Sequence, residues 1–205
     1  MSHILLITSS PNASESLSTR FATELAEGIK AGTHATLNVR DLVANPVPHI
    51  TPAYLSGRYK LASERNPEEV AAMDIAQELV DEIIAADVVV IASGMINFSM
   101  PSQLKAWFDQ VTLPGVAFRY GETGPQGLLT GRKVYAITAT GGIYSEGPYA
   151  PFDYQNNYLL HLLGFIGLTP VELVRLEGTV LGEESLNATI AKGKKTIQQL
   201  VNNVA

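Results

Sequence analysis

The chain has 205 residues, of which 46% are hydrophobic and 17% are charged, enough apolar material for one sizeable core. Its net charge of −6 argues against general nucleic-acid binding, and the absence of cysteine excludes disulfides and thiolate metal sites. No apolar run is long enough to cross a bilayer, and the N-terminal apolar run lacks the preceding basic region of a signal peptide. We expect a globular protein of the reducing cytoplasm that binds neither nucleic acid nor membrane.

The first half of the chain alternates strand-like and helix-like segments. The continuous apolar run Ile4–Thr8 predicts a strand covered on both faces, and a weaker alternation in residues 34–42 predicts a strand nearer a sheet edge. Between them lies a helical stripe of Phe21, Leu25 and Ile29. A second helix begins at "NPEEV", where Asn66 and Glu69 form a capping-box pattern. We expect its buried side to carry Val70, Met73, Val80 and Ile84.

The second half continues the alternation. Asp87–Ser93 is the most strand-like segment, and the helix after Pro101 places one face inward, made of Leu104, Phe108 and Val111. Further strands are predicted at residues 132–140 and 170–178, separated by a helix that ends at Gly164 or Gly167. The last helix begins at "EESL" and carries apolar residues at helical spacing, namely Leu186, Ile190, Ile197 and Val201.

Two connections, residues 41–65 and 112–131, are long for a compact domain. Three prolines in the first favour a fixed, extended path over a flexible linker. The second is rich in glycine yet carries Phe118, Arg119 and Tyr120. Such segments are usually functional or mobile, or they contain elements that the sequence pattern does not reveal.

Five strands alternating with five helices predict an α/β fold, a doubly wound parallel sheet with helices on both faces. Right-handed crossovers leave few topologies, and five strands favour the flavodoxin-like strand order 2-1-3-4-5. We find no internal repeat and no domain linker, so we expect residues 1–205 to form a single domain.

Ligands of such sheets bind beyond the C-terminal ends of the strands, where the strand order reverses. In the predicted order this point brings together the loops after strands one, three and four. Their sequences are "SSPNASESLS", "SGMINFSMP" and "ATGGIYSEGP".

The first of these loops is rich in serine and ends where a helix starts. Unpaired backbone N–H groups and the helix dipole favour an anion there, and Ser10, Ser16 and Ser18 add hydroxyl donors. The loop lacks the glycine pair and lysine of an NTP-binding loop, and it lacks the G-x-G-x-x-G run of a dinucleotide turn. It suits one terminal phosphate, although serines are also common as turn and cap residues.

The other two loops suit a flat ring. Met95, Ile96 and Phe98 are apolar where loops are usually polar, which fits an aromatic ligand or packing over the sheet end. Gly141 and Gly142 allow close approach of the backbone to a ligand, or a tight turn. The three loops together resemble a mononucleotide site.

The chain resembles the FMN-dependent NADH-azoreductases, flavodoxin-like reductases of quinones and azo dyes. "SSPNASESLS" is similar to their phosphate-binding serines, "MINF" to their M-Y-N-F loop, and "ATGGI" to their S-R-G-G-like loop. "GVAFRYGETGPQGLLTGRK" and "LLGFIG" also match family segments, so the resemblance covers nearly the whole chain in the family's motif order.

The resemblance implies that residues of all three loops bind FMN. They are Ser10, Ser16, Leu17, Ser18, Met95, Ile96, Asn97, Phe98, Ala139, Thr140, Gly141 and Gly142. Two departures from the family pattern stand out, since Ile96 replaces a tyrosine and Ala139-Thr140 replaces Ser-Arg. Backbone contacts can survive both changes, so we expect FMN binding to persist and substrate preference to shift.

The resemblance also implies a ping-pong reaction in a homodimer with active sites at the subunit interface. NADH or NADPH gives a hydride to FMN, which then reduces a quinone or cleaves an azo compound to aromatic amines, without a catalytic side chain. We expect Phe118 and Tyr120 to form a wall or lid of the substrate slot, or to anchor their loop to the core. Parts of the two long connections are expected at the interface.

Other functions fit the sequence less well. A flavodoxin-type one-electron carrier would share the acidic charge and FMN, but large loops and an apolar slot favour a two-electron enzyme. The sequence lacks the G-x-S-x-G elbow of a serine hydrolase. The histidines are scattered without metal-ligand spacing and are expected in packing or solvent contact: His3, His34, His49 and His161. The basic run Lys192–Lys195 is expected to be a solvated helix face.

Overall fold

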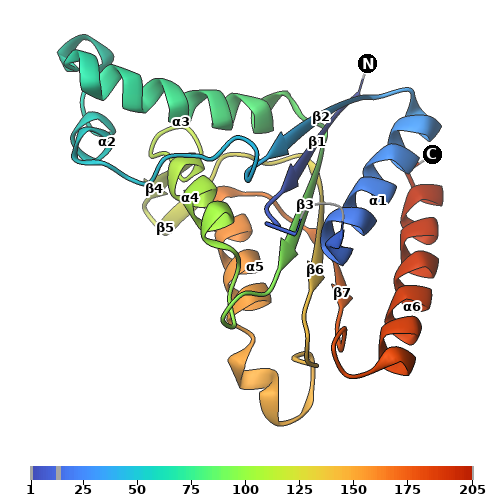
Figure 1. Cartoon of the computed structure of the whole chain (residues 1–205). Coiled ribbons are helices and arrows are strands. Elements are labelled where there is room, and N and C mark those ends of the chain that lie inside the picture. The colour runs from blue at the N-terminus through green and yellow to red at the C-terminus, as the bar shows by residue number, and fades with distance from the viewer. Residues whose placement is uncertain (1, 13–14, 205) are drawn as a thin grey trace.

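The centre of the protein is a five-stranded parallel sheet, seen in a computed structural model that describes residues 2–12 and 15–204. The strands lie in the order β2-β1-β3-β6-β7 (Figure 1). Their bounds are β1 (His3–Thr8), β2 (Thr36–Asp41), β3 (Val88–Gly94), β6 (Lys133–Ala139) and β7 (Val171–Leu176). Numbered along the chain, these strands have the order 2-1-3-4-5, so the predicted flavodoxin-like topology is confirmed, as is the edge position of β2.

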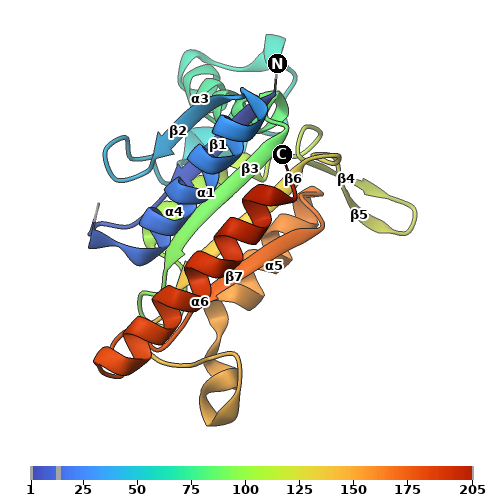
Figure 2. The same ribbon diagram turned by 90° about the vertical axis from the view of Figure 1, so that its right-hand side faces the viewer.

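Helices cover both faces of this sheet (Figures 1 and 2). One face carries α1 (Leu17–Thr33) and α6 (Glu183–Asn202). The other carries α3 (Pro67–Ala85), α4 (Ser102–Val111) and α5 (Tyr154–Ile166). Among the described residues, no helix has the length and apolar character needed to cross a membrane.

Two hydrophobic cores follow from the period-two alternation of strand side chains. Leu5 and Ile7 of β1 point into the core under α3, α4 and α5, whereas Ile4 and Leu6 point into the core under α1 and α6. Because each strand near the sheet centre buries both faces, its sequence reads as a continuous apolar run instead of an alternating one. At about 25 cal/mol per Å² of apolar surface, this two-sided burial is the main stabilising term of the fold.

The predicted buried side of α3 is partly wrong. Met73 and Val80 are buried, but Val70 and Ile84 are exposed. The helix instead buries a stripe that begins at Glu69 and includes Ala76, Leu79 and Ile83. The buried stripe therefore includes a glutamate, which a pattern of apolar residues alone does not predict.

The two long connections contain short elements that the sequence pattern did not predict. The first holds α2 (Pro52–Gly57) and a 3₁₀ turn, η2 (Ala62–Glu64). The second holds an antiparallel hairpin of β4 (Phe118–Gly121) and β5 (Gly124–Gly127). A further 3₁₀ segment, η3 (Gly147–Phe152), precedes α5.

A close contact between two glycines holds the hairpin against the end of α5. A Cβ on Gly127 would lie 2.2 Å from the backbone nitrogen of Gly167, so only glycine fits there. The Leu129 N–H donates to the Ile166 carbonyl oxygen at 2.9 Å, and the Phe118 and Phe165 ring centroids are 4.6 Å apart. The hairpin is therefore fixed by tertiary contacts.

Glu69 links the first long connection to α3 through a buried carboxylate. Its Oε1 accepts hydrogen bonds from Lys60 Nζ and Ser56 Oγ, both at 2.6 Å, and its Oε2 accepts from the Asn66 N–H at 3.0 Å. The Lys60 ammonium, followed by Ser56 and the Asn66 N–H, lowers the pKa of Glu69 from 4.5 to about 2.

This depressed pKa predicts acid-sensitive stability. The stabilisation by Glu69 is fully present above pH 4.5 and is lost as the pH falls through about 2. We expect Glu69→Gln to lower the free energy of unfolding at pH 7, with a difference from the wild type that shrinks between pH 4.5 and 2. Urea denaturation at several pH values measures this, and a pH-independent difference would contradict the prediction.

Candidate functional site

The loops after β1, β3 and β6 meet at the C-terminal edge of the sheet, at the lower end of the strands in Figure 1. Ser9 Oγ donates to the Ala92 carbonyl oxygen at 2.8 Å and joins the end of β1 to β3. The Met95 N–H donates to the Ala139 carbonyl oxygen at 2.8 Å and joins the loops after β3 and β6. The predicted convergence of the three loops is therefore present in the structure.

The serine-rich loop forms the start of α1. Ser16 is the N-cap residue, whose Oγ accepts from the Thr19 N–H at 3.4 Å and lies 3.1 Å from Ser18 Oγ. Ser18 is fully buried. Thr19 Oγ1 is also buried and has no hydrogen-bond partner among the described residues. Ser14, another serine of this loop, lies outside the described residues.

A cavity of about 420 Å³ opens at this helix start. Ser10, Ser16 and Leu17 line it from the first loop, and Ala139 lines it from the end of β6. Helix N-termini leave backbone N–H groups without intrahelical partners and carry a positive partial charge. Hydroxyls, unpaired donors and an available cavity make this a suitable place for a phosphate.

The loop after β3 is a tight turn with an uncommon backbone. Ile96 and Ser99 exchange N–H···O=C hydrogen bonds at 2.8 and 3.1 Å. The two central residues, Asn97 and Phe98, have positive φ angles of 48° and 70°. For phenylalanine this conformation is strained by about 1–3 kcal/mol, and such strain gathers at ligand sites. The turn presents Ile96 and Phe98 to solvent, and the Phe98 side chain is 51% exposed.

The loop after β6 is held by backbone contacts with the loop after β7. Thr140 is buried, and its Oγ1 donates to the Gly142 carbonyl oxygen at 2.8 Å. Its carbonyl oxygen accepts from the N–H and Oγ1 of Thr179, at 3.2 and 3.1 Å. Thr140, which stands where the resembling family has arginine, thus shapes the loop through its hydroxyl. Gly141 and Gly142 follow with bare backbone.

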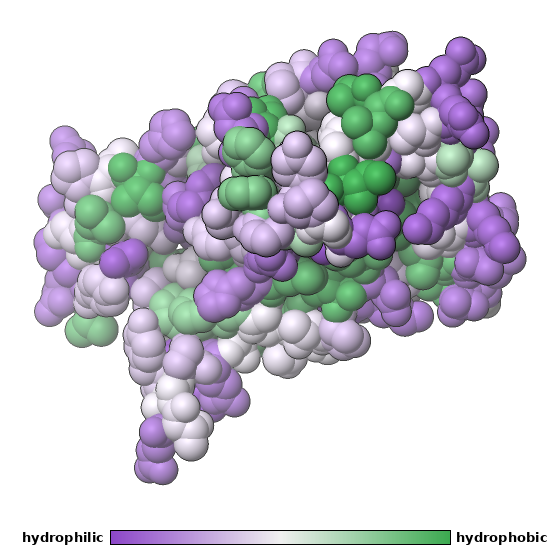
Figure 3. Space-filling view, turned by 90° about the horizontal axis from the view of Figure 1, so that it is seen from below, coloured by the Kyte–Doolittle hydropathy of each residue, from purple (hydrophilic) through white to green (hydrophobic). Residues whose placement is uncertain are grey.

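Aromatic rings from two elements surround the strained turn. The Phe98 centroid lies 6.4 Å from that of Tyr144, edge to face, and 6.3 Å from that of Phe152. Phe152 and Tyr149 belong to η3 and are exposed. Figure 3 views this edge from below and shows apolar side chains at the surface among polar ones. Exposed aromatic rings beside a concave edge suit a flat, conjugated ligand.

Phe118 and Tyr120 lie on the β4–β5 hairpin, away from the three loops of the same chain (Figures 1 and 2). Phe118 is buried against Phe165, which fits the expected anchoring of the loop to the core. Tyr120 is 78% exposed. Within one chain these two side chains do not join the other residues predicted for the site.

A buried polar network beneath the site was not predicted. Gln155 Nε2 donates to the carbonyl oxygen and the Oγ of Ser93, at 3.0 and 2.9 Å. Asp153 caps α5 and pairs with Arg175 on β7, whose Nη1 lies 2.7 Å from its Oδ2. Arg175 is also 3.7 Å from Glu177, which accepts from the Tyr144 N–H at 2.8 Å.

These contacts fix both ends of the loop that carries the paired glycines and the aromatic rings. An aspartate before a helical segment is a capping signal that sequence can show. Its pairing with a distant arginine depends on the tertiary fold and leaves no local signal.

The described residues contain no cluster of three or more metal-ligating side chains. His3 Nδ1 lies 2.6 Å from Thr36 Oγ1 at the opposite end of β1, away from the three loops. The site thus consists of hydroxyls, backbone groups and apolar rings.

The family profile described as having a flavodoxin-like fold matches residues 2–201. The chain is 55% identical to an FMN-dependent NADH:quinone oxidoreductase 2 of Rhizobium etli, over 100% of both chains. It is 56% identical to an FMN-dependent NADH:quinone oxidoreductase 1 of Burkholderia lata, over 98% of both.

A solved structure of an FMN-dependent NADH-azoreductase from Bacillus anthracis, in complex with FMN, superposes with a TM-score of 0.86. Its sequence identity is 28%, and the match covers 98% of this chain and 100% of that one. The protein belongs to the flavodoxin-like fold family, in the group of FMN-dependent NADH:quinone oxidoreductases that it matches from end to end.

Proposed function

We propose that the protein is an FMN-dependent NADH:quinone oxidoreductase that also reduces azo compounds. The observation that carries the proposal is the meeting of a serine-lined helix start, a strained aromatic turn and a glycine pair at one sheet edge. The end-to-end likeness to reductases of this name supports it. Bound FMN would supply the hydride chemistry, accepting two electrons from NADH and passing them to the acceptor.

In this proposal the residues of the chain bind the flavin and orient it. Ser10, Ser16 and Ser18, with the backbone N–H groups at the start of α1, would hold the phosphate. The turn around Asn97 and the backbone of Gly141 and Gly142 would hold the ring. The remaining proposed contacts come from the same loops: Leu17, Met95, Ile96, Phe98, Ala139 and Thr140.

The aromatic rings give the site its selectivity for flat acceptors. Phe98, Tyr144 and Phe152 would stack against a quinone or azo dye and exclude water from the reacting faces. Hydride transfer requires reacting atoms at roughly 3–3.5 Å, so a flat slot contributes mainly through position. Ile96, which is exposed in the turn, would make the slot more apolar.

A homodimer is part of the same proposal. The exposed apolar residues of the first long connection support it: Leu55, Tyr59 and Leu61. Tyr120, which is exposed on the hairpin, would then reach the substrate slot of the partner subunit, and Phe118, buried against Phe165, would hold the hairpin in place for it. Sedimentation velocity at micromolar protein is expected to give twice the mass of 22.0 kDa, and a monomer would contradict this part.

The reductase proposal is tested by the colour of the protein loaded with FMN. Anaerobic NADH is expected to bleach the flavin absorbance, and benzoquinone is expected to restore it. A one-electron carrier on the same fold would be bleached by dithionite but not by NADH, which would contradict the proposal.

We also place the protein in the cytoplasm, because a cysteine-free chain suits a reducing compartment.

A further inference from the structure

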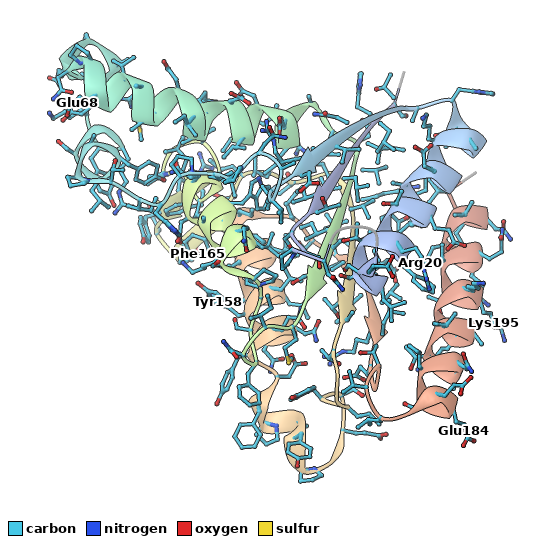
Figure 4. The ribbon with its side chains drawn as sticks, viewed as in Figure 1. Arg20, Glu68, Tyr158, Phe165, Glu184 and Lys195 are labelled. Carbon is cyan, nitrogen blue, oxygen red and sulfur yellow. The ribbon has the colours of Figure 1, made fainter. Side chains whose placement is uncertain are left out.

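Arg20 lies at the edge of the cavity proposed for the FMN phosphate. The same cavity is lined by Ser10, Ser16 and Ala139, and on its far side by Leu186 and Ile190 of α6. Figure 4 shows Arg20 beside the lower end of α1, on the side that faces α6. No residue from Lys192 to Lys195 reaches this cavity, so Arg20 is its only cationic lining residue among those described.

The geometry of a helix directs Arg20 towards the start of α1. Arg20 is the fourth residue of this helix, and helical side chains tilt towards the N-terminus, over the preceding turn. The preceding turn is the one that contains Ser16 and Leu17. The guanidinium carbon lies 5.5 Å from the centroid of the buried Phe21 ring, a cation–π contact.

The start of α1 lacks the acidic residues found at the start of the two longer helices, α3 and α6. α3 and α6 each begin with two glutamates, as the helix dipole favours, whereas the first turn of α1 has no acidic residue. A cation near the N-terminal end of a helix is disfavoured by the dipole, and an anion bound between the two would offset this. Among the described residues, Arg20 forms no salt bridge, although Glu15 lines the same cavity.

We propose that Arg20 recognises the FMN phosphate and makes the site selective for FMN over riboflavin. This inference rests on the proposed function. The serines supply neutral hydrogen bonds to the phosphate, and Arg20 supplies the charge that the lysine-free loop otherwise lacks. Guanidinium groups are well suited to this role, because their planar donors match phosphate oxygens in pairs.

The test measures the dissociation constants of apo-protein for FMN and for riboflavin by quenching of flavin fluorescence. Arg20→Gln is expected to weaken FMN binding about tenfold and to leave riboflavin binding within about twofold. Arg20→Lys is expected to retain part of the preference, since it keeps the charge but loses the paired donors. Added KCl is expected to weaken FMN binding more in the wild type than in Arg20→Gln.

The matched control is Lys30→Gln, which removes the same charge at the other end of α1, where Lys30 pairs with Glu27 at 3.1 Å. It is expected to leave both dissociation constants unchanged. Equal weakening of FMN and riboflavin by Arg20→Gln, or no weakening of either, would overturn the role of Arg20 and leave the proposed function standing. Failure of the wild type to bind FMN at all would overturn the proposed function itself.

Discussion

Replacing Ser18 with aspartate is expected to abolish FMN binding while the protein stays folded. Ser18 is the second residue of α1 and is fully buried beside the N-cap serine, with 3.1 Å between the two hydroxyl oxygens. A carboxylate there would stand next to the phosphate in the proposed site. Like charges about 4 Å apart repel by about 4 kcal/mol at an effective dielectric constant of about 20.

That repulsion corresponds to almost three orders of magnitude in affinity, and partial solvation of the loop reduces it. We therefore expect the dissociation constant for FMN to rise at least about 100-fold. An acidic residue in the first turn of a helix is favourable for the free protein, so the helix should persist. Flavin fluorescence quenching measures the affinity, and circular dichroism checks the fold.

Ser18→Asn is the matched control, because asparagine has nearly the size of aspartate without its charge. It is expected to keep more FMN affinity than Ser18→Asp by a factor of about 10 or more. If both variants lose FMN equally, the loss reflects crowding, and the electrostatic explanation is wrong. If Ser18→Asp binds FMN as the wild type does, the serine loop is not the phosphate site.

Replacing the buried Asp153 with alanine is expected to cause a large loss of stability. The carboxylate is only 2% exposed and has three partners: the Asn156 N–H at 2.8 Å, Asn156 Nδ2 at 3.1 Å and Arg175 Nη1 at 2.7 Å. Its loss removes a helix cap, worth about 1 kcal/mol, and leaves Arg175 without its close partner.

Breaking a buried ion pair from one side costs about 3–5 kcal/mol. The Arg175 side chain keeps some contact with solvent and lies 3.7 Å from Glu177, so we expect a loss near 3 kcal/mol. Urea denaturation at pH 7 gives the free energy of unfolding. Asp153→Asn keeps the cap and the volume but still leaves Arg175 without its charged partner, so we expect it to cost only about 1 kcal/mol less than Asp153→Ala.

The double variant Asp153→Asn with Arg175→Met tests whether the pair itself carries the effect. Its loss in the free energy of unfolding is expected to be smaller than the sum of the losses of the two single variants, because it leaves no unpaired buried charge. Additive losses, or a loss below 1 kcal/mol for Asp153→Ala, would show that the pair does not hold the loop between β6 and α5.

The strand order and most of the candidate site could be predicted from the sequence, because their signals are local. Ile4–Thr8 and Asp87–Ser93 are largely apolar runs, which are typical of strands in a sheet buried on both faces. The parallel strands of a doubly wound sheet carry their C-terminal loops to one edge, so the sequence predicts that Ser16, Asn97 and Gly141 lie there.

The misplaced face of α3 has a chemical cause. Sequence patterns treat glutamate as exposed, but Glu69 is buried because Lys60 and Ser56, from another segment, pair with its carboxylate. Glu69 lies on the buried face of the helix together with Ile83, whereas Ile84 lies on the exposed face. A pattern of apolar residues cannot show such a partner.

The hairpin and the polar network beneath the site were beyond prediction for a similar reason. β5 has the sequence "GPQG", without an alternating apolar pattern, and a backbone contact between Gly127 and Gly167 fixes it. Arg175 and Asp153 are 22 positions apart and pair only once β7 and α5 lie side by side. The positive φ angle of Phe98 likewise reflects the bonds between Ile96 and Ser99, since phenylalanine does not favour it.

A crystal structure of the protein with FMN bound is the most direct test of the central claim that the three loops hold one flavin. We expect the phosphate within hydrogen-bonding distance of Ser16 and Ser18 at the start of α1. We expect the ring between the turn at Asn97 and the backbone of Gly141 and Gly142. A flavin bound elsewhere, or a phosphate away from α1, would contradict the account.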